Sequence, residues 1–119
     1  MTLSEKQRLF MQLLGQFLVW IYKAGYTVTG GELERSQAQA DANAASGAGI
    51  SNSLHLKRLA IDLNLFLLND GKWEYQQLSE AYQPLGEKWE SMHELCRWGG
   101  RFHAHPDGNH FSLTHEGVS

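Results

Sequence analysis

Hydrophobic positions near the N-terminus recur with the period of an α-helix. The apolar positions are Leu9, Phe10, Leu13, Leu14, Phe17, Leu18 and Ile21. Spacings of three and four residues place such side chains on one face of a helix. Ser4, with Gln7 three residues later, has the pattern of a capping box, and Gly25 is a suitable terminator. The pattern predicts a helix over residues 4–24 that packs on the core and carries no catalytic group.

The clearest strand pattern lies at residues 59–68, where two rows of side chains alternate. One row is entirely Leu and Ile, and Asp62 lies in the other row. Because side chains along a strand point alternately to opposite faces, the Leu/Ile row is expected on the core and Asp62 on the opposite face. The Asn-Asp-Gly-Lys sequence at 69–72 predicts a turn directly after this strand.

Shorter patterns complete the predicted fold. They are a strand at 26–29, a helix at 75–95 interrupted at Pro84, and strands at 97–102 and 109–113. In the last strand, His110 and Ser112 fall on the face opposite Phe111 and Leu113. The order predicts an α+β fold, with a small, mainly antiparallel sheet and flanking helices. A length of 119 residues fits one domain over 1–119.

Composition excludes several classes of function. A net charge of −3 and no basic stripe argue against a nucleic-acid partner. The apolar run 10–22 is shorter than the roughly 20 residues of a membrane span, so no membrane insertion is expected. It is not followed by the small-residue cleavage site of a signal peptide. Cys96 is the only cysteine and is expected as a helix residue on the core. We expect a monomer.

Two strands each present one good metal ligand on the non-core face, Asp62 and His110. A third candidate, His55, lies seven residues before Asp62. A catalytic zinc typically takes three protein ligands and a water, and two imidazoles with one carboxylate suit it. Seven extended residues span about 23 Å, so His55 can join only if the chain turns back within 56–59. The predicted zinc site therefore lies on the sheet.

Peptide hydrolysis at such a site also needs a proton acceptor and a positive group. Asp107, three residues before His110, is the candidate base. Arg35 is the candidate for the developing oxyanion or a substrate carboxylate. The stretch from Ser36 to Ser53, rich in Ala, Gly, Ser and Asn, is expected to be an active-site loop.

Other histidines leave alternatives open. His103 and His105 form a His-x-His pair that suits metal binding from one strand face. A closed, non-catalytic zinc site would take its fourth ligand from that pair or from Cys96. His93-Glu94 does not start a His-Glu-x-x-His motif, because position 97 is Arg. His93 and His115 are expected at the surface.

Three segments resemble those of the M15 metallopeptidases, which are D-alanyl-D-alanine carboxypeptidases and phage L-alanyl-D-glutamate endopeptidases. Residues 53–63, Ser-Leu-His-Leu-Lys-Arg-Leu-Ala-Ile-Asp-Leu, resemble the signature Ser-x-His-x-x-Gly-x-Ala-x-Asp. Residues 107–111, Asp-Gly-Asn-His-Phe, resemble the second motif, an acidic residue three before a histidine. Trp98-Gly99-Gly100-Arg101-Phe102 is similar to the preceding segment of the phage endolysin branch.

The resemblance implies specific roles. His55, Asp62 and His110 match the zinc ligands, and Asp107 matches the catalytic acid/base. Arg35 and Ser53 match substrate contacts. Arg58 stands where the family has glycine, so Arg58 is expected to reach any tight turn there in another way.

The function implied is a zinc-dependent (Zn²⁺) peptidase acting on the stem peptide of peptidoglycan. An L-alanyl-D-glutamate endolysin of a phage is expected first, and a D-alanyl-D-alanine carboxypeptidase second. Without an export signal, the protein would accumulate in the host cytoplasm and reach the cell wall on release. The two activities share one zinc core, so the motifs do not distinguish which bond is cut.

Overall fold

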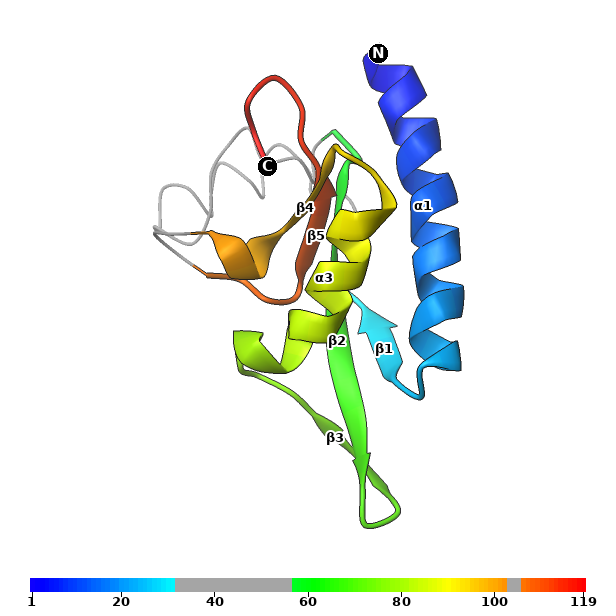
Figure 1. The fold of residues 1–119 in the computed structure, drawn as a ribbon, viewed down its shortest axis with the longest axis vertical. Helices are drawn as coiled ribbons and strands as arrows, with labels where there is room; N and C mark the ends of the chain where they lie inside the picture. Colours follow the sequence, from blue (N-terminus) through cyan, green and yellow to red (C-terminus); the bar gives the residue numbers. More distant parts are fainter. Residues whose placement is uncertain (32–56, 103–105) are drawn as a thin grey trace.

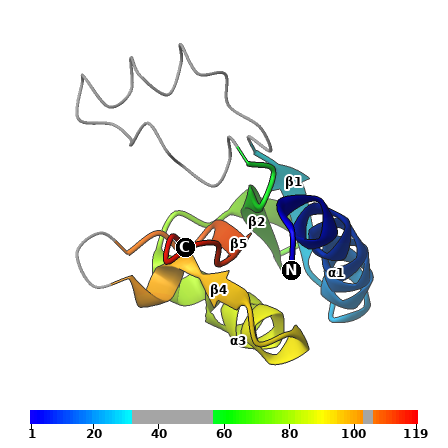
Figure 2. The ribbon, with the colours of Figure 1, turned by 90° about the horizontal axis from the view of Figure 1, so that it is seen from above.

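The described part of the chain folds into a small antiparallel sheet with two helices on one face (Figures 1 and 2). This computed structural model describes residues 1–31, 57–102 and 106–119. Its helices are α1 (Leu3–Lys23) and α3 (Gln83–Met92), with short 3-10 helices at Ser79–Tyr82 and Gly99–Arg101. Its strands are β1 (Thr27–Gly30), β2 (Ala60–Asn69), β3 (Lys72–Tyr75), β4 (Cys96–Trp98) and β5 (His110–Leu113). The predicted α+β class is confirmed.

Strand β2 organises the sheet because it is long enough to take two partners along one edge. The order is β1-β2-β5-β4, and β3 also pairs with β2. β5 lies opposite Ala60–Asp62, and β3 lies opposite Phe66–Asn69. All four strand pairs are antiparallel. β2 therefore connects the strand that carries His110 to the β2–β3 hairpin.

The N-cap of helix α1 lies two residues before the predicted one, Ser4. Its N-cap is Thr2, and the side chains and backbones of Thr2 and Glu5 form the reciprocal box. Gln7 instead donates from Nε2 to the Lys57 carbonyl at 2.9 Å, which ties the helix to the turn before β2. Gly25, with a φ of 93°, follows the helix as predicted.

The core lies between the helices and the predicted Leu/Ile row of β2. Phe10 and Phe17 of α1 pack on Trp89 of α3, with ring centroids 5.8 and 5.2 Å apart. Cys96 is in this core as predicted, although in strand β4, and burial raises the pKa of its thiol to about 12. His115 is buried, contrary to expectation, and lies 2.9 Å from the Lys6 ammonium.

The prediction of a helix at 75–95 is wrong at both ends. Tyr75 ends β3, which forms a hairpin with β2 through Asp70 and Gly71. Both turn residues have positive φ, 51° and 77°, the conformation of a type I′ hairpin turn. Pro84 lies in the first turn of α3, where its missing N–H costs nothing, so it starts the helix instead of interrupting it.

Near the C-terminus, the strand predicted at 97–102 is shorter than expected. β4 ends at Trp98, and Gly99–Arg101 turns as a 3-10 helix. Within the described ranges, neither helix combines the length and the apolar character needed to cross a membrane.

The turn before β2 places Arg58 in a conformation that favours glycine. Its φ is 57°, so Arg58 adopts the left-handed region itself and does not avoid it as expected. This conformation costs a residue with a Cβ about 1–2 kcal/mol. Arg58→Gly is therefore expected to raise the free energy of unfolding by about 0.5–1 kcal/mol in denaturant titrations, after the entropy cost of glycine.

The neighbouring Lys57 provides the matched control. Lys57→Gly is expected to lower the free energy of unfolding by about 0.5–1 kcal/mol, because glycine loses more conformational freedom on folding than lysine. Equal losses of stability in the two variants would contradict strain at Arg58.

Candidate metal centre and active site

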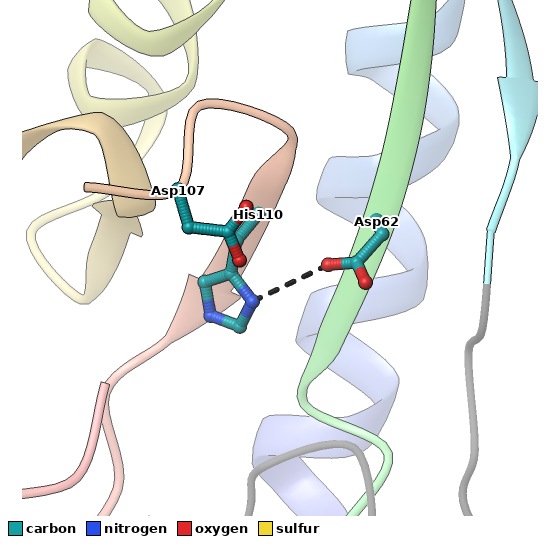
Figure 3. A group of neighbouring side chains, drawn as sticks. All are labelled: Asp62, Asp107 and His110. Atoms are coloured by element: carbon teal, nitrogen blue, oxygen red, sulfur yellow. Dashed lines mark ion pairs between the residues drawn. The ribbon is translucent and has the colours of Figure 1, made fainter. Parts of the chain in front are cut away.

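Strands β2 and β5 place Asp62 and His110 directly opposite each other. The two residues are Cα partners in the antiparallel register. The Leu63 N–H donates to the Asn109 carbonyl at 2.8 Å, so the adjacent 62/110 pair occupies a non-hydrogen-bonded position. Side chains approach most closely at such positions. His110 Nδ1 accordingly lies 3.5 Å from Asp62 Oδ1 (Figure 3).

Asp107 joins this pair from the turn that enters β5. The His110 N–H donates to the Asp107 carbonyl at 3.1 Å, which closes the turn. Ligand atoms of Asp62, Asp107 and His110 all lie within 4.8 Å of one another. Figure 3 shows the Asp107 carboxylate beside the imidazole, on a different segment from Asp62. Two carboxylates around one imidazole make a site suited to a cation.

The donor set and its spacing fit zinc. Imidazole nitrogen and carboxylate oxygen are both ordinary zinc ligands. Two ligands at about 2.1 Å from a tetrahedral ion lie about 3.4 Å apart. The 3.5 Å separation of His110 Nδ1 and Asp62 Oδ1 matches that edge. Asp62 and His110 could thus hold one ion without rearrangement of the sheet.

Burial differs among the three residues in a way that suits different tasks. The His110 side chain is 10% exposed and that of Asp62 24%, whereas Asp107 is exposed. The Phe102 ring lies 5.6 Å from the His110 ring, and Ser112 is fully buried. The sheet face opposite the helices is therefore covered at this end. His110 and Asp62 are held in place, and Asp107 can reach solvent.

The Asp107 turn is fixed by contacts from two other segments, Trp98-Gly99 and Ser79. The Asp107 N–H donates to the Gly99 carbonyl at 2.9 Å. The Gly108 N–H donates to Ser79 Oγ at 2.9 Å, and its carbonyl accepts from Trp98 Nε1 at 2.7 Å. These bonds set where the carboxylate of Asp107 stands relative to His110.

Trp98 and Ser79 were not predicted as parts of the site. Trp98 packs its ring where Gly86 and Gly100 leave room, and a Cβ on either glycine would overlap it. The Trp-Gly-Gly segment resembled its counterpart in the endolysin branch, but its spacing gave no sign of a hydrogen bond to the turn. For Ser79, no motif in the sequence marked the contact.

The structure brings together three of the residues predicted for the site, Asp62, Asp107 and His110. His55, Arg35 and Ser53 lie outside the described residues, as do the predicted loop 36–53 and the pair His103 and His105. The chain turn predicted within 56–59 is present at Lys57 and Arg58. The assignment of ligands and base stays a prediction.

Gly99 is expected to be essential for the geometry of the Asp107 turn. A Cβ at Gly99 would lie 2.1 Å from the Asp107 carbonyl oxygen, a backbone atom that cannot move alone. Gly99→Ala should therefore displace Asp107, cost about 1–3 kcal/mol of stability and lower activity at saturating metal. Thermal unfolding and initial rates measure the two effects.

Gly15 is the control for adding a methyl group. A Cβ there would meet nothing within 4 Å, and the residue is exposed on α1. Gly15→Ala should stabilise the helix by about 0.5–1 kcal/mol and leave activity unchanged. Wild-type activity in Gly99→Ala would show that the close approach of Gly99 to Asp107 is not needed.

Comparison with known proteins gives one similar fold and one family. A search of curated proteins finds no match. One solved structure with a similar fold is the L-Ala D-Glu endopeptidase ChiX of Serratia marcescens. It superposes with a TM-score of 0.73 at 19% identity, over 93% of this chain and 85% of that chain.

A family model described as D-alanyl-D-alanine carboxypeptidase matches residues 46–113, which is more than half of the chain and contains Asp62, Asp107 and His110. The chain therefore belongs to the M15 family of peptidases.

Proposed function

We propose that this peptidase is zinc-dependent and cleaves the stem peptide of peptidoglycan, at the bond between L-Ala and D-Glu. The observation that carries the proposal is the cluster of Asp62, His110 and Asp107 on a sheet that is similar in fold to an L-Ala D-Glu endopeptidase. Asp62 and His110 would hold the ion, with His55 as the third ligand.

The chemistry divides between the ion and Asp107. When bound, zinc lowers the pKa of a coordinated water and polarises the scissile carbonyl. Asp107 accepts the proton from the attacking water and delivers it to the amine nitrogen of the leaving group. Its exposure and its place beside His110 support this role. Arg35 and Ser53 are proposed to contact the substrate.

The biological setting is also a proposal. A single domain over 1–119, acting as a monomer, fits an endolysin that accumulates in the host cytoplasm and meets the cell wall at host lysis. The alternative activity is a D-alanyl-D-alanine carboxypeptidase, which the description of the matching family favours.

Digestion of purified peptidoglycan, followed by mass spectrometry of the fragments, separates the two activities. The endopeptidase releases stem peptides that begin with D-Glu and leaves L-Ala on the glycan. The carboxypeptidase releases only terminal D-Ala. Zinc dependence is measured in the same assay after chelation and re-addition. An enzyme that stays fully active when metal-free would contradict the proposal.

A further inference from the structure

The sheet face that carries Asp62 continues along β2 into a row of exposed apolar side chains. Residues 62, 64, 66 and 68 share one face of the strand because side chains alternate. The partner strand β3 places Tyr75 opposite Phe66 and Trp73 opposite Leu68, on that same face. These four residues, Phe66, Leu68, Trp73 and Tyr75, are called the hairpin patch.

The hairpin patch is open to solvent and has an ordered aromatic centre. Leu68, Trp73 and Tyr75 are 56%, 48% and 47% exposed. The Phe66 and Tyr75 rings pack with centroids 5.7 Å apart. In Figure 1 the β2–β3 hairpin projects beyond the rest of the sheet. Exposed aromatic groups on a rigid strand pair are typical of a binding surface.

A hollow connects the hairpin patch to Asp107. It has a volume of about 200 Å³ and lies where β3 ends and the turn into β5 begins. Tyr75 lines it from one side, and Asp107 and Asn109 line it from the other. The Asn109 amide also donates to the Asn64 side chain at 3.3 Å, on the same face. Patch, hollow and candidate base thus form one continuous surface.

We infer that the hairpin patch binds the glycan chain of peptidoglycan next to the bond being cut. This inference rests on the proposed function. In peptidoglycan the L-Ala of the stem peptide is attached to the sugar, so an enzyme that cuts after L-Ala works beside the glycan. Pyranose rings present apolar C–H faces that stack on aromatic rings, and amides such as Asn64 and Asn109 suit acetamido groups.

Other occupants fit the surface less well. The hairpin carries Asp70, Lys72 and Glu74, a mixture of signs that lacks the basic cluster needed for anionic lipid. Four apolar side chains are also far fewer than the roughly 20 residues per partner of a stable dimer. A sugar chain needs only a few stacking positions and matches the narrow shape of the hairpin.

The test compares one substrate with sugar and one without. Trp73→Ala is expected to lower kcat/KM about tenfold on a disaccharide-bearing stem peptide. On the sugar-free stem peptide the change should stay within about twofold, because the metal site is untouched. Trp73→Phe keeps a ring and should retain most of the activity. Tyr22→Ala, at an exposed tyrosine on α1, is the matched control and should match wild type on both substrates.

Equal losses on both substrates, or no loss on either, would overturn the inference. So would a wild-type dimer that Trp73→Ala converts to monomer in light scattering, because the patch would then be an interface between copies.

Binding to peptide-free glycan strands separates this inference from the proposed function. If wild type co-sediments with the strands and Trp73→Ala does not, glycan binding by the hairpin patch is supported even if no peptide bond is cut. If wild type and Trp73→Ala cleave peptidoglycan at equal rates, the proposed function is supported and glycan binding by the hairpin patch is contradicted.

Discussion

Asp107→Asn is expected to keep its bound metal and to lose about 10²–10⁴-fold in kcat. The amide has the shape of the carboxylate but cannot accept the proton of the attacking water or return it to the leaving amine. Asp107 is exposed and belongs to the turn before His110, so its replacement leaves the Asp62–His110 pair in place. Metal content by elemental analysis and initial rates on peptidoglycan measure the two halves of the prediction.

Glu87→Gln is the matched control for the loss of one carboxylate. Glu87 is exposed on α3 and hydrogen-bonds to Gln83 at 3.0 Å. Its variant should show wild-type rates and metal content. If Asp107→Asn binds no metal, Asp107 is a ligand; if it keeps wild-type activity, another group is the base.

Asp62→Ala is expected to lose both the metal and the activity. Asp62 lies directly across from His110 and supplies the oxygen at 3.5 Å from its Nδ1. Changes to groups that only support metal ligands already cost about 10–100-fold in metal affinity, so removing a ligand should cost at least about 100-fold. Titration with a zinc indicator measures the affinity, and circular dichroism checks that the sheet is intact.

The expected pattern differs between the two variants. Asp62→Ala should regain part of its activity when zinc is raised far above the wild-type requirement, whereas Asp107→Asn should not respond to zinc. If Asp62→Ala binds zinc as tightly as wild type, Asp62 is not a metal ligand.

The part of the fold with a strong periodic pattern could be predicted from the sequence. The alternation in β2 fixed which of its side chains face the helices, because burial of the Leu/Ile row leaves Asp62 only the other face. The register of β2 against β5 was not predictable, since it depends on long-range pairing. That register is what places Asp62 opposite His110.

The errors of prediction have physical causes. Both Thr2 with Glu5 and Ser4 with Gln7 satisfy the capping pattern, and the contact of Gln7 with Lys57 is a tertiary one. Strand β3 is only four residues long and was not predicted, although Asp70-Gly71 is a strong hairpin signal; its last residue, Tyr75, was assigned to the helix. His115 was expected at the surface but is buried, because Lys6, on a helix distant in the sequence, packs beside it.

The candidate site, like the fold, could be predicted only in part. Motif spacing selected Asp62, Asp107 and His110, and the fold brings their ligand atoms within 4.8 Å. The contacts that hold the Asp107 turn come from Ser79 and Trp98, which only the folded chain brings there.

A crystal structure of the zinc-loaded protein, with an anomalous difference map at the zinc edge, tests the central claim most directly. The map should show one peak within about 2.3 Å of a carboxylate oxygen of Asp62 and a nitrogen of His110. A third protein ligand is expected, with a remaining position open to water beside Asp107. A peak elsewhere, or an ion closed by four protein side chains, would contradict a catalytic zinc at this site.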